Sequence, residues 1–378
     1  MGLLATLKKK LTQGDLPFAE FMAMVLYDPN FGYYTTQRSK FGKAGDFITA
    51  PELTPLFALT LANQCQQIFA ALTNSANTVI FEFGAGTGRL AVDLLRQLEA
   101  LFCLPTNYTI IELSADLRAR QQQLIQQEIP HLLPRVHWHA YWPVTNCQGV
   151  IIANEVLDAM PIHRFRLTEQ GLQEGYLSIN KKNKNSSLQE IYKFCTNIRL
   201  RNHIHNIIPP NLPLPYQSEA NLFLAGWLKE CFNMLTAGIM LIIDYGFPRH
   251  EYYHVDRNCG TLMCHYRHQA HTNPLINLGE QDITTHVDFT LVAEGAVAAG
   301  FKLAGFTNQA AFLLSNGLLN LLAQMPSLPT HHKINAVQAV KRLLMPHEMG
   351  ELYKVMALSK NLNIPLAGFQ EQNQLDKL

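Results

Sequence analysis

The sequence lacks features that would point to a secreted, membrane-spanning or nucleic-acid-binding protein. Its seven cysteines are scattered and never form a Cys-x-x-Cys pair, so we expect neither a disulfide framework nor a metal site, and a reducing compartment fits best. The net charge is +1, which gives no electrostatic reason to expect a nucleic-acid partner. No apolar run approaches the roughly 18 residues that a membrane span needs.

The first residues, MGLLATLKKKLTQG, also lack an apolar core of signal-peptide length and the Arg-rich, Ser-rich composition of a transit segment. Leu3, Leu7 and Leu11 instead recur at helical spacing, which predicts a short amphipathic helix. We therefore expect a cytoplasmic protein that has no membrane partner.

Hydrophobic residues make up 48% of the 378 residues, which is enough for one large domain with additions or for two domains. Residues 1–75 are predicted to be mainly helical, with apolar residues at helical spacing after Phe18 and again from Pro55 to Ala71. We interpret this part as an N-terminal helical segment.

From Thr78 onward, short apolar strands alternate with helical patterns, which is typical of a parallel sheet covered on both faces. The five earlier strands are predicted at 78–83, 108–112, 135–139, 149–153 and 239–244, with helices at 88–101 and 114–127. A later helix near 288–300 and strands at 301–308 and 352–359 would complete a Rossmann-like seven-stranded α/β sheet with one antiparallel strand.

Residues 161–220 interrupt this alternation as a β-rich insertion. The alternating segments 162–167 and 172–179 flank a turn and predict a hairpin. After the strand at 239–244 we expect a polar, His-rich loop. The predicted division of the chain is an N-terminal segment at 1–75, a core at 76–160 and 221–360, the insertion at 161–220, and a polar tail at 361–378.

A glycine loop follows the first strand of the core, at the place where a helix begins. Its glycines are Gly84, Gly86 and Gly88, and they allow a ligand to approach the backbone closely. A dinucleotide fingerprint would need its third glycine at the position of Arg89, which disfavours NAD and an oxidoreductase.

The same loop suits S-adenosylmethionine, which carries an α-ammonium, a carboxylate, a ribose diol and a sulfonium. Glu82 could meet the ammonium, and Glu112, which ends the next strand, could accept both ribose hydroxyls. The backbone amides of the loop could face the carboxylate and ribose. We therefore predict this cofactor and the following binding residues: Glu82, Gly84, Ala85, Gly86, Gly88 and Glu112.

The segment after the strand at 149–153 supplies the candidate catalytic residues Asn154, Glu155 and Asp158. Ligands of open α/β sheets lie beyond the carboxyl ends of the strands, so these side chains should face the methyl donor. Two carboxylates suit the donor fork of a guanidinium, which makes Glu155 and Asp158 a candidate arginine clamp. Alternatively, Asp158 caps a helix or pairs with Arg164.

Asp244 and Tyr245 end the strand at 239–244 and are candidates for the wall of a substrate pocket, or they simply make the turn. His265 and His286 lie in loops that could close over the site. A histidine in a loop can equally well serve as hydrogen-bonded structure, and that alternative stays open.

These motifs, taken together, resemble the MidA family of class I methyltransferases. The matching residues run in the family order as Asp28-Pro29, Gly32-Tyr33-Tyr34, 45–52, the glycine loop, 110–114, 153–161, 243–246, 260–262, 282–284 and 286–289. The resemblance implies a seven-stranded methyltransferase core, with S-adenosylmethionine as donor. It also implies that the N-terminal helical segment, residues 1–75, covers the cofactor site and that Gly45, Asp46 and Phe47 lie near that cofactor.

The family includes the mitochondrial complex I assembly factor that methylates a protein arginine. The resemblance therefore implies a methyltransferase that acts on an arginine side chain of a partner protein. Two alternatives stay open: a small-molecule or other amino-acid methyltransferase with the same donor, and a cofactor-binding assembly chaperone without turnover.

Overall fold

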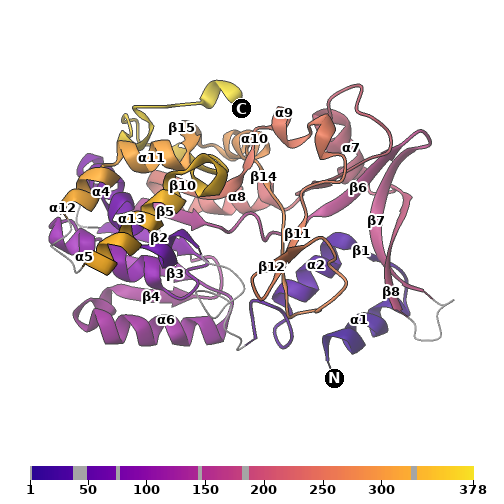
Figure 1. The fold of residues 1–378 in the computed structure, drawn as a ribbon, viewed down its shortest axis with the longest axis horizontal. Helices are drawn as coiled ribbons and strands as arrows, with labels where there is room; N and C mark the ends of the chain where they lie inside the picture. The colour runs from indigo at the N-terminus through magenta and orange to yellow at the C-terminus, as the bar shows by residue number, and fades with distance from the viewer. Residues whose placement is uncertain (1, 37–48, 74–76, 144–146, 181–186, 325–329) are drawn as a thin grey trace.

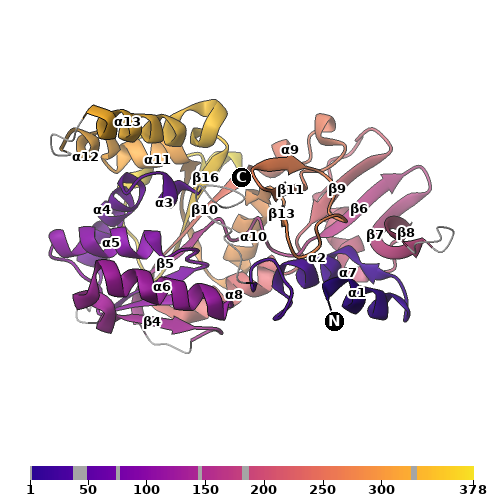
Figure 2. The same cartoon turned by 60° about the horizontal axis from the view of Figure 1, so that its bottom comes forward.

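A computed structural model describes residues 2–36, 49–73, 77–143, 147–180, 187–324 and 330–378 (Figure 1). The predicted cofactor residues Gly45, Asp46 and Phe47 lie outside this described part of the chain. Figures 1 and 2 show a large sheet with its helices at one end of the molecule and a second β region at the other. Helices α1 and α2 lie with that second region.

The large sheet contains the seven predicted strands in the order β15-β16-β10-β5-β2-β3-β4. β16 is antiparallel to both of its neighbours, and the other pairs are parallel, so the single antiparallel strand is confirmed. A short strand, β14 (Val287–Asp288), adds to β10. The seven strands are β2 (Thr78–Phe83), β3 (Asn107–Ile111), β4 (Val136–His139), β5 (Cys147–Asn154), β10 (Leu235–Phe247), β15 (Lys302–Asn308) and β16 (Tyr353–Lys360).

Both faces of this sheet are buried. Along β2, Ile80 contributes to one hydrophobic core, whereas Val79, Phe81 and Phe83 contribute to the core on the opposite face. Every residue of the strand is buried, as the continuous apolar run predicts for a strand in the middle of a parallel sheet. Each large side chain buried in this way stabilises the fold by about 1.5–3 kcal/mol.

Helices cover the two faces and fix where the strands end. Helices α8 and α10 lie on one face, and the others on the opposite face. Ser114 caps α6 by accepting the Leu117 N–H at 3.3 Å, and Asp288 caps α10 from Leu291 at 3.1 Å. The helices are α4 (Leu56–Ala71), α5 (Arg89–Ala100), α6 (Ala115–Glu128), α8 (Leu224–Met234), α10 (Phe289–Ala299), α11 (Gln309–Ser315), α12 (Leu318–Gln324) and α13 (Thr330–Leu344).

The insertion forms a second, antiparallel sheet in the order β1-β7-β6-β9, with β8 beside β7. The predicted hairpin is present as β6 and β7. β1 comes from the N-terminal segment, and that segment shares a hydrophobic core with the insertion. The elements are α1 (Leu3–Leu11), β1 (Leu16–Pro17), α2 (Phe18–Tyr27), β6 (His163–Thr168), β7 (Gly171–Asn180), β8 (Ser187–Phe194), α7 (Ile198–Ile207) and β9 (Tyr216–Ala220). The division of the chain into four parts stays a proposal.

The expected His-rich loop is wrong in part, because it contains a three-stranded antiparallel sheet. Its strands are β11 (Met263–Tyr266), β12 (Gln269–His271) and β13 (Asp282–Thr284). Cys264 and Ile283 pair across this sheet and are buried in the core of the N-terminal segment. Polar residues between them hid this apolar contact from the sequence pattern. Over the described ranges, no helix is long and apolar enough to cross a membrane.

Candidate active site

A cavity of about 390 Å³ lies at the carboxyl ends of β2, β3 and β5. Residues that follow β2, β3, β4 and β5 form one part of the lining, and Tyr27, Tyr34 and Asp282 form another. We call these the sheet wall and the far wall. The volume is within the range of small-molecule sites in proteins.

The glycine loop forms part of the sheet wall in a conformation that favours glycine. Gly84, Gly86 and Gly88 all have positive φ, at 61°, 53° and 89°. A Cβ at Gly88 would also lie 3.3 Å from Gln121 of α6. Glycine therefore lets the loop follow this tight path without backbone strain and present its backbone to the cavity.

Two buried acids, Glu82 and Glu112, flank that loop on the sheet wall. Tyr108 donates its hydroxyl to Glu82 Oε2 at 2.7 Å, but burial still raises the pKa of Glu82 to about 7. Glu112 accepts the Ser114 N–H at 2.9 Å and the Gln121 side-chain N–H at 3.3 Å. A carboxylate has about four acceptor sites, so each acid can accept further donors from a ligand in the cavity.

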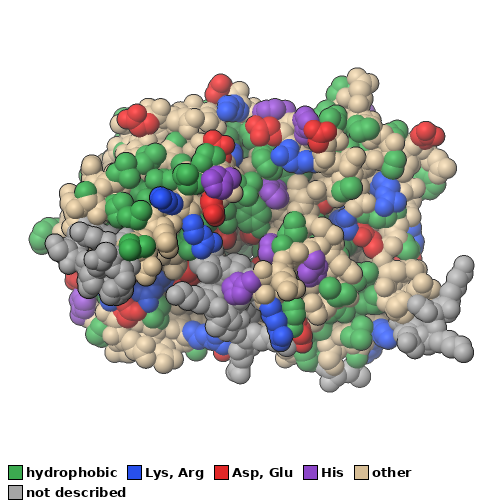
Figure 3. Space-filling view, viewed as in Figure 1, with side chains coloured by type: hydrophobic (Ala, Val, Ile, Leu, Met, Phe, Trp, Pro, Cys, Tyr) green, Lys and Arg blue, Asp and Glu red, His purple; other side chains and the backbone are tan. Residues whose placement is uncertain are grey.

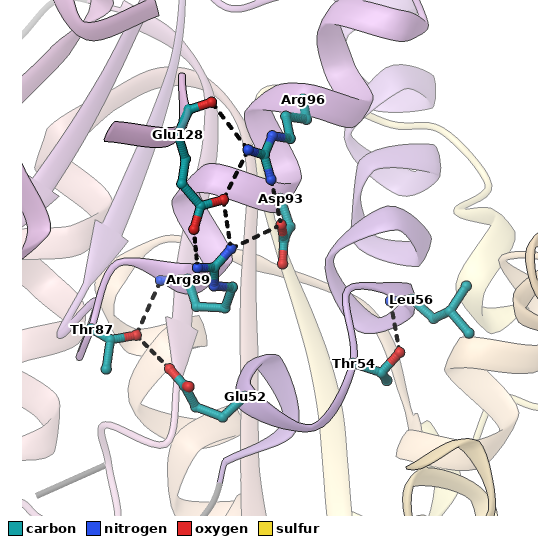
Figure 4. A network of polar contacts seen from close by, with 8 residues as sticks. All are labelled: Glu52, Thr54, Leu56, Thr87, Arg89, Asp93, Arg96 and Glu128. Carbon is teal, nitrogen blue, oxygen red and sulfur yellow. Dashed lines mark hydrogen bonds and ion pairs between the residues drawn. The ribbon is translucent and has the colours of Figure 1, made fainter. Parts of the chain in front are cut away.

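A short helix of the N-terminal segment, α3 (Ala50–Leu53), reaches the glycine loop (Figure 4). Thr87 donates its hydroxyl to Glu52, and the Arg89 N–H donates to Thr87 Oγ1 at 3.3 Å. The Arg89 guanidinium pairs with Glu128 at the end of α6. Arg89, which stands where a dinucleotide-binding loop would have its third glycine, therefore links α5 to α6. Helix α3 contributes to the part of the cavity beside the glycine loop.

The loop after β5 is held by Asp244, which is fully buried. Its Oδ2 accepts three consecutive backbone N–H groups, from Val156 at 3.2 Å, Leu157 at 2.9 Å and Asp158 at 3.3 Å. Its Oδ1 accepts the N–H of Tyr245 at 2.9 Å. Burial raises the pKa of Asp244, and the charges of Asp158 and Glu155 on the loop after β5 add to this effect. Asp244 therefore lies behind the sheet wall and shapes the loop.

The backbone at Glu155 is left-handed, with a φ of 52°, which is unfavourable for a residue other than glycine. Its N–H donates to the carbonyl of Ile243 at 2.9 Å. The tight turn directs Asn154, Glu155 and Asp158 to the cavity, so the structure brings the three predicted catalytic residues together there. Strain of this kind persists only where the surrounding structure imposes it.

The two carboxyl groups of this loop are desolvated. Burial, together with the Asp158 charge, raises the pKa of Glu155 to about 8, although Tyr353 and the backbone of Ala50 face it with donors. Burial likewise raises the pKa of Asp158 to about 6, although Tyr245 donates its hydroxyl to Asp158 Oδ2 at 2.6 Å. The Arg164 guanidinium pairs with Glu190 at 2.5 Å and does not supply the alternative partner considered for Asp158.

Three buried oxygens on this loop have no hydrogen-bond partner among the described residues. They are Asn154 Oδ1, Glu155 Oε1 and Asp158 Oδ1. Buried acceptors without donors are costly in free energy, and a ligand with several N–H donors would satisfy them. The loop is therefore suited to bind a donor-rich cation.

The far wall contains residues to which the sequence reasoning gave no role. Tyr27 and Tyr34 stack with ring centroids 5.5 Å apart. Tyr27 donates its hydroxyl to the carbonyl of Ala159 at 2.9 Å, and Tyr34 donates to Asp282 Oδ1 at 2.8 Å. Tyr34 and Asp282 belong to short motifs of the family resemblance, which was the only signal that could have found them.

The remaining predicted pocket residues lie away from the cavity lining in the described part of the chain. Tyr245 contacts the cavity only through Asp158. His286 stacks against Phe247 with centroids 5.3 Å apart, and burial lowers its pKa to about 4. His265 lies on β11, in register with Asp282 of β13. Within the described ranges, no cluster of His, Cys, Asp and Glu is arranged to hold a metal ion.

The cavity is acidic. Among its described lining residues, Arg89 is the single Lys or Arg, whereas six carboxyl groups line it: Glu52, Glu82, Glu112, Glu155, Asp158 and Asp282. On the face seen in Figure 3, acidic and basic side chains are interspersed. The acidic character is therefore local to the cavity, where it favours cationic ligands such as a sulfonium, an ammonium or a guanidinium.

The residues present fit S-adenosylmethionine. The glycine cradle admits close approach to the backbone, Glu82 and Glu112 can accept the ammonium and ribose donors, and the acid-rich cavity suits the sulfonium. The aromatic side chains of Phe83, Trp142 and Trp227 pack with centroids 5.2–6.4 Å apart and add apolar surface to the same cavity.

Comparison with known proteins agrees with this fit. The model of a family of S-adenosyl-L-methionine-dependent methyltransferases matches residues 60–307. A crystal structure of a Burkholderia thailandensis protein, described as a methyl transferase and bound to S-adenosyl-homocysteine, is 38% identical with a TM-score of 0.93 and covers 100% of this chain and 96% of that one. A second Burkholderia thailandensis structure of the same superfamily is also 38% identical, has a TM-score of 0.90 and gives the same coverage.

The curated relatives are more distant but match along nearly the whole chain. The Drosophila melanogaster homolog of the mitochondrial protein arginine methyltransferase NDUFAF7 is 27% identical over 93% of this chain and 83% of its own length. The human protein of that name is 26% identical over 96% of this chain and 84% of its own. The chain belongs to this family of S-adenosylmethionine-dependent class I methyltransferases.

Proposed function

We propose that this enzyme methylates the guanidinium of an arginine in a partner protein. The observation that carries the proposal is a pair of buried oxygens, Glu155 Oε1 and Asp158 Oδ1, which have no partner within the described ranges and lie on the sheet wall beside the glycine loop. A guanidinium offers five N–H donors in a plane, and two carboxylates can accept them as parallel pairs.

The site would then perform transfer mainly by positioning and by removal of water. Glu82, the glycine loop and Glu112 would hold bound S-adenosylmethionine, which supplies an electrophilic methyl group. Glu155 and Asp158 would fix the guanidinium plane so that one nitrogen faces that methyl group. As the nitrogen–carbon bond forms, the carbon–sulfur bond breaks and its electron pair stays on sulfur.

The methylated nitrogen then releases one proton, and Glu155 is the proposed acceptor. Its pKa of about 8 suits proton uptake near neutral pH. Asn154 would accept a further N–H and so restrict rotation of the guanidinium. The curated relatives, which are named as protein arginine methyltransferases, support the same assignment.

The proposal is tested by incubating the protein with methyl-labelled S-adenosylmethionine and an extract of cells that lack it. We expect label in protein and methyl-arginine in its hydrolysate by mass spectrometry. Glu155→Gln should lower the rate by about 100-fold or more, as loss of a general base does, and should keep S-adenosylhomocysteine binding. Glu169→Gln changes an exposed acid outside the cavity and serves as the matched control.

The other outcomes identify the alternatives. Label confined to small molecules would support a small-molecule or free amino-acid substrate. An equal rate for Glu155→Gln and the unaltered protein would remove Glu155 from the mechanism. Donor binding without transfer to any acceptor would support an assembly chaperone.

We also propose that the protein acts in the cytosol. All seven cysteines are free thiols, which fits a reducing compartment. Several curated relatives are named as mitochondrial proteins, so subcellular fractionation of the native host tests this point directly.

A further inference from the structure

The far wall carries side chains that suit a cation, although S-adenosylmethionine needs no further acids on that wall. Glu82 and Glu112 lie beside the glycine loop, and Glu52 is engaged by Thr87. Asp158 and Asp282 remain on the side of the two tyrosines. Asp158 is only 5% exposed and its Oδ1 has no partner among the described residues. A second cation besides the donor would satisfy it.

The two tyrosine rings form a stacked pair in this region, which leaves only their outer faces and edges for a cation, and Tyr33 packs against Tyr34 with ring centroids 5.0 Å apart. Tyr27 and Tyr34 stack at 21° between ring planes, and both line the cavity. Their hydroxyl groups are held by Ala159 and Asp282, so both rings have fixed orientations. The Tyr27 hydroxyl contacts the loop after β5 at Ala159, and burial, together with the nearby charges of Asp282 and Asp158, raises the pKa of Tyr27.

Aromatic faces beside carboxylates distinguish the two basic side chains. A guanidinium is flat, weakly hydrated and able to stack on a ring while its edge pairs with a carboxylate. A lysine ammonium is compact and strongly hydrated, and it gains less from a ring face. We propose that Tyr27, Tyr34 and Asp282, beside Asp158, form a guanidinium subsite that makes the enzyme select arginine over lysine. This inference rests on the proposed arginine methylation: the two rings set the preference for arginine, and Asp282 attracts either cation.

The test measures peptide binding to the full chain saturated with S-adenosylhomocysteine. Two short peptides differ only in a central arginine or lysine between glycines, and calorimetry gives both affinities. The unaltered protein should prefer the arginine peptide by about tenfold. Tyr34→Leu should weaken the arginine peptide by about tenfold and leave the lysine peptide nearly unchanged, so that the preference disappears.

Two further variants distinguish the effect of the Tyr34 ring on peptide binding from the effect of the Asp282 charge. Tyr34→Phe keeps the ring and should keep most of the preference. Asp282→Asn removes a charge that attracts both cations and should weaken both peptides similarly. Phe194→Leu, which removes an exposed ring of the second sheet, is the matched control. S-adenosylhomocysteine affinity and the melting temperature should stay near those of the unaltered protein and show that each variant is folded.

Equal affinity of the unaltered protein for the two peptides would overturn the inference, as would an unchanged preference in Tyr34→Leu. Failure of the proposed function has a different signature. A tyrosine-dependent arginine preference without methyl-arginine in any labelled extract would support the subsite and refute arginine methylation. Methyl-arginine formation with an unchanged preference in Tyr34→Leu would refute only the subsite.

Discussion

The sheet wall and the far wall of the cavity are built in different ways. The sheet wall consists of loops that directly follow β2, β3, β4 and β5, and backbone hydrogen bonds to a single carboxylate, Asp244, fix the last of them. The far wall joins Tyr27 and Tyr34 to Asp282, which is 248 residues away from Tyr34 in the chain. It depends on side-chain contacts between the N-terminal segment and β13.

The difference indicates a division of labour. Parallel strands that end at one edge give a rigid frame, which suits a donor whose groups are the same in every reaction cycle. Side chains brought together from distant segments can change without disturbing the sheet, which suits recognition of an acceptor. Changes at the glycine loop and its two acids should therefore affect donor binding, changes at Asp244 should affect stability, and changes on the far wall should affect acceptor choice.

The largest effect is expected from Asp244→Ala on the sheet wall. Four buried N–H groups would lose their acceptor, and this loss should outweigh the relief of repulsion with neighbouring acids. We expect the free energy of unfolding to fall by about 3 kcal/mol in urea titrations. Asp256→Ala, with its side chain 87% exposed, is the control. A stability equal to that of the control would mean that the loop keeps its shape without Asp244.

Glu112→Gln tests the part of the sheet wall that we expect to bind S-adenosylmethionine. The change keeps one acceptor oxygen but removes the charge, so we expect S-adenosylhomocysteine to bind about tenfold more weakly by calorimetry. The ratio of arginine- to lysine-peptide affinity should not change, because Glu112 acts on the donor. Glu99→Gln, on the outer surface of α5, controls for loss of an acid. A shift of the peptide ratio would show that the walls are not independent.

The smallest effect is expected from pH. The pKa of Glu155 is about 8 and that of Asp158 about 6, so ionisation of these acids should strengthen arginine-peptide binding as pH rises from 6 to 8. The gain between pH 7 and 8 should be below about tenfold, and Glu155→Gln should flatten that part of the profile. A fall in affinity over this range would contradict the clamp.

The same raised pKa values have the opposite sign for stability of the free protein. Between the ordinary pKa of a carboxyl group and its raised native value, the folded state binds more protons than the unfolded state. The contribution of Glu155 and Asp158 to stability should therefore decrease as pH rises from about 4 to 8. Melting temperatures of the unaltered protein and Glu155→Gln across this range measure that contribution.

The sequence predicted the sheet wall because its signals are local. A glycine loop, a preceding acid such as Glu82, and a loop directly after a strand lie within a few residues of one another. Strand–helix alternation then places all of these at the same edge of the sheet. The strands of the large sheet were predicted for the same reason, since continuous apolar runs mark buried strands.

The far wall could not be predicted in this way. Nothing near Tyr34 in the sequence indicates that its hydroxyl meets Asp282, because the contact depends on how α2 and β13 share one core. Asp244 illustrates a different limit of prediction from the sequence. The sequence predicted it at the end of a strand, like Glu82, but β10 continues to Phe247, and the loop after β5 folds over Asp244 so that its carboxylate accepts backbone N–H groups. The strand position alone does not distinguish these outcomes.

At position 155, the left-handed backbone favours one kind of residue and the proposed chemistry favours another. Glycine or asparagine would adopt a φ of 52° more easily and would relieve about 1 kcal/mol of conformational strain. Neither residue could take up a proton or pair with a guanidinium as a carboxylate does. Under the proposed mechanism, a glutamate at this position therefore gives up some stability of the free protein in exchange for turnover.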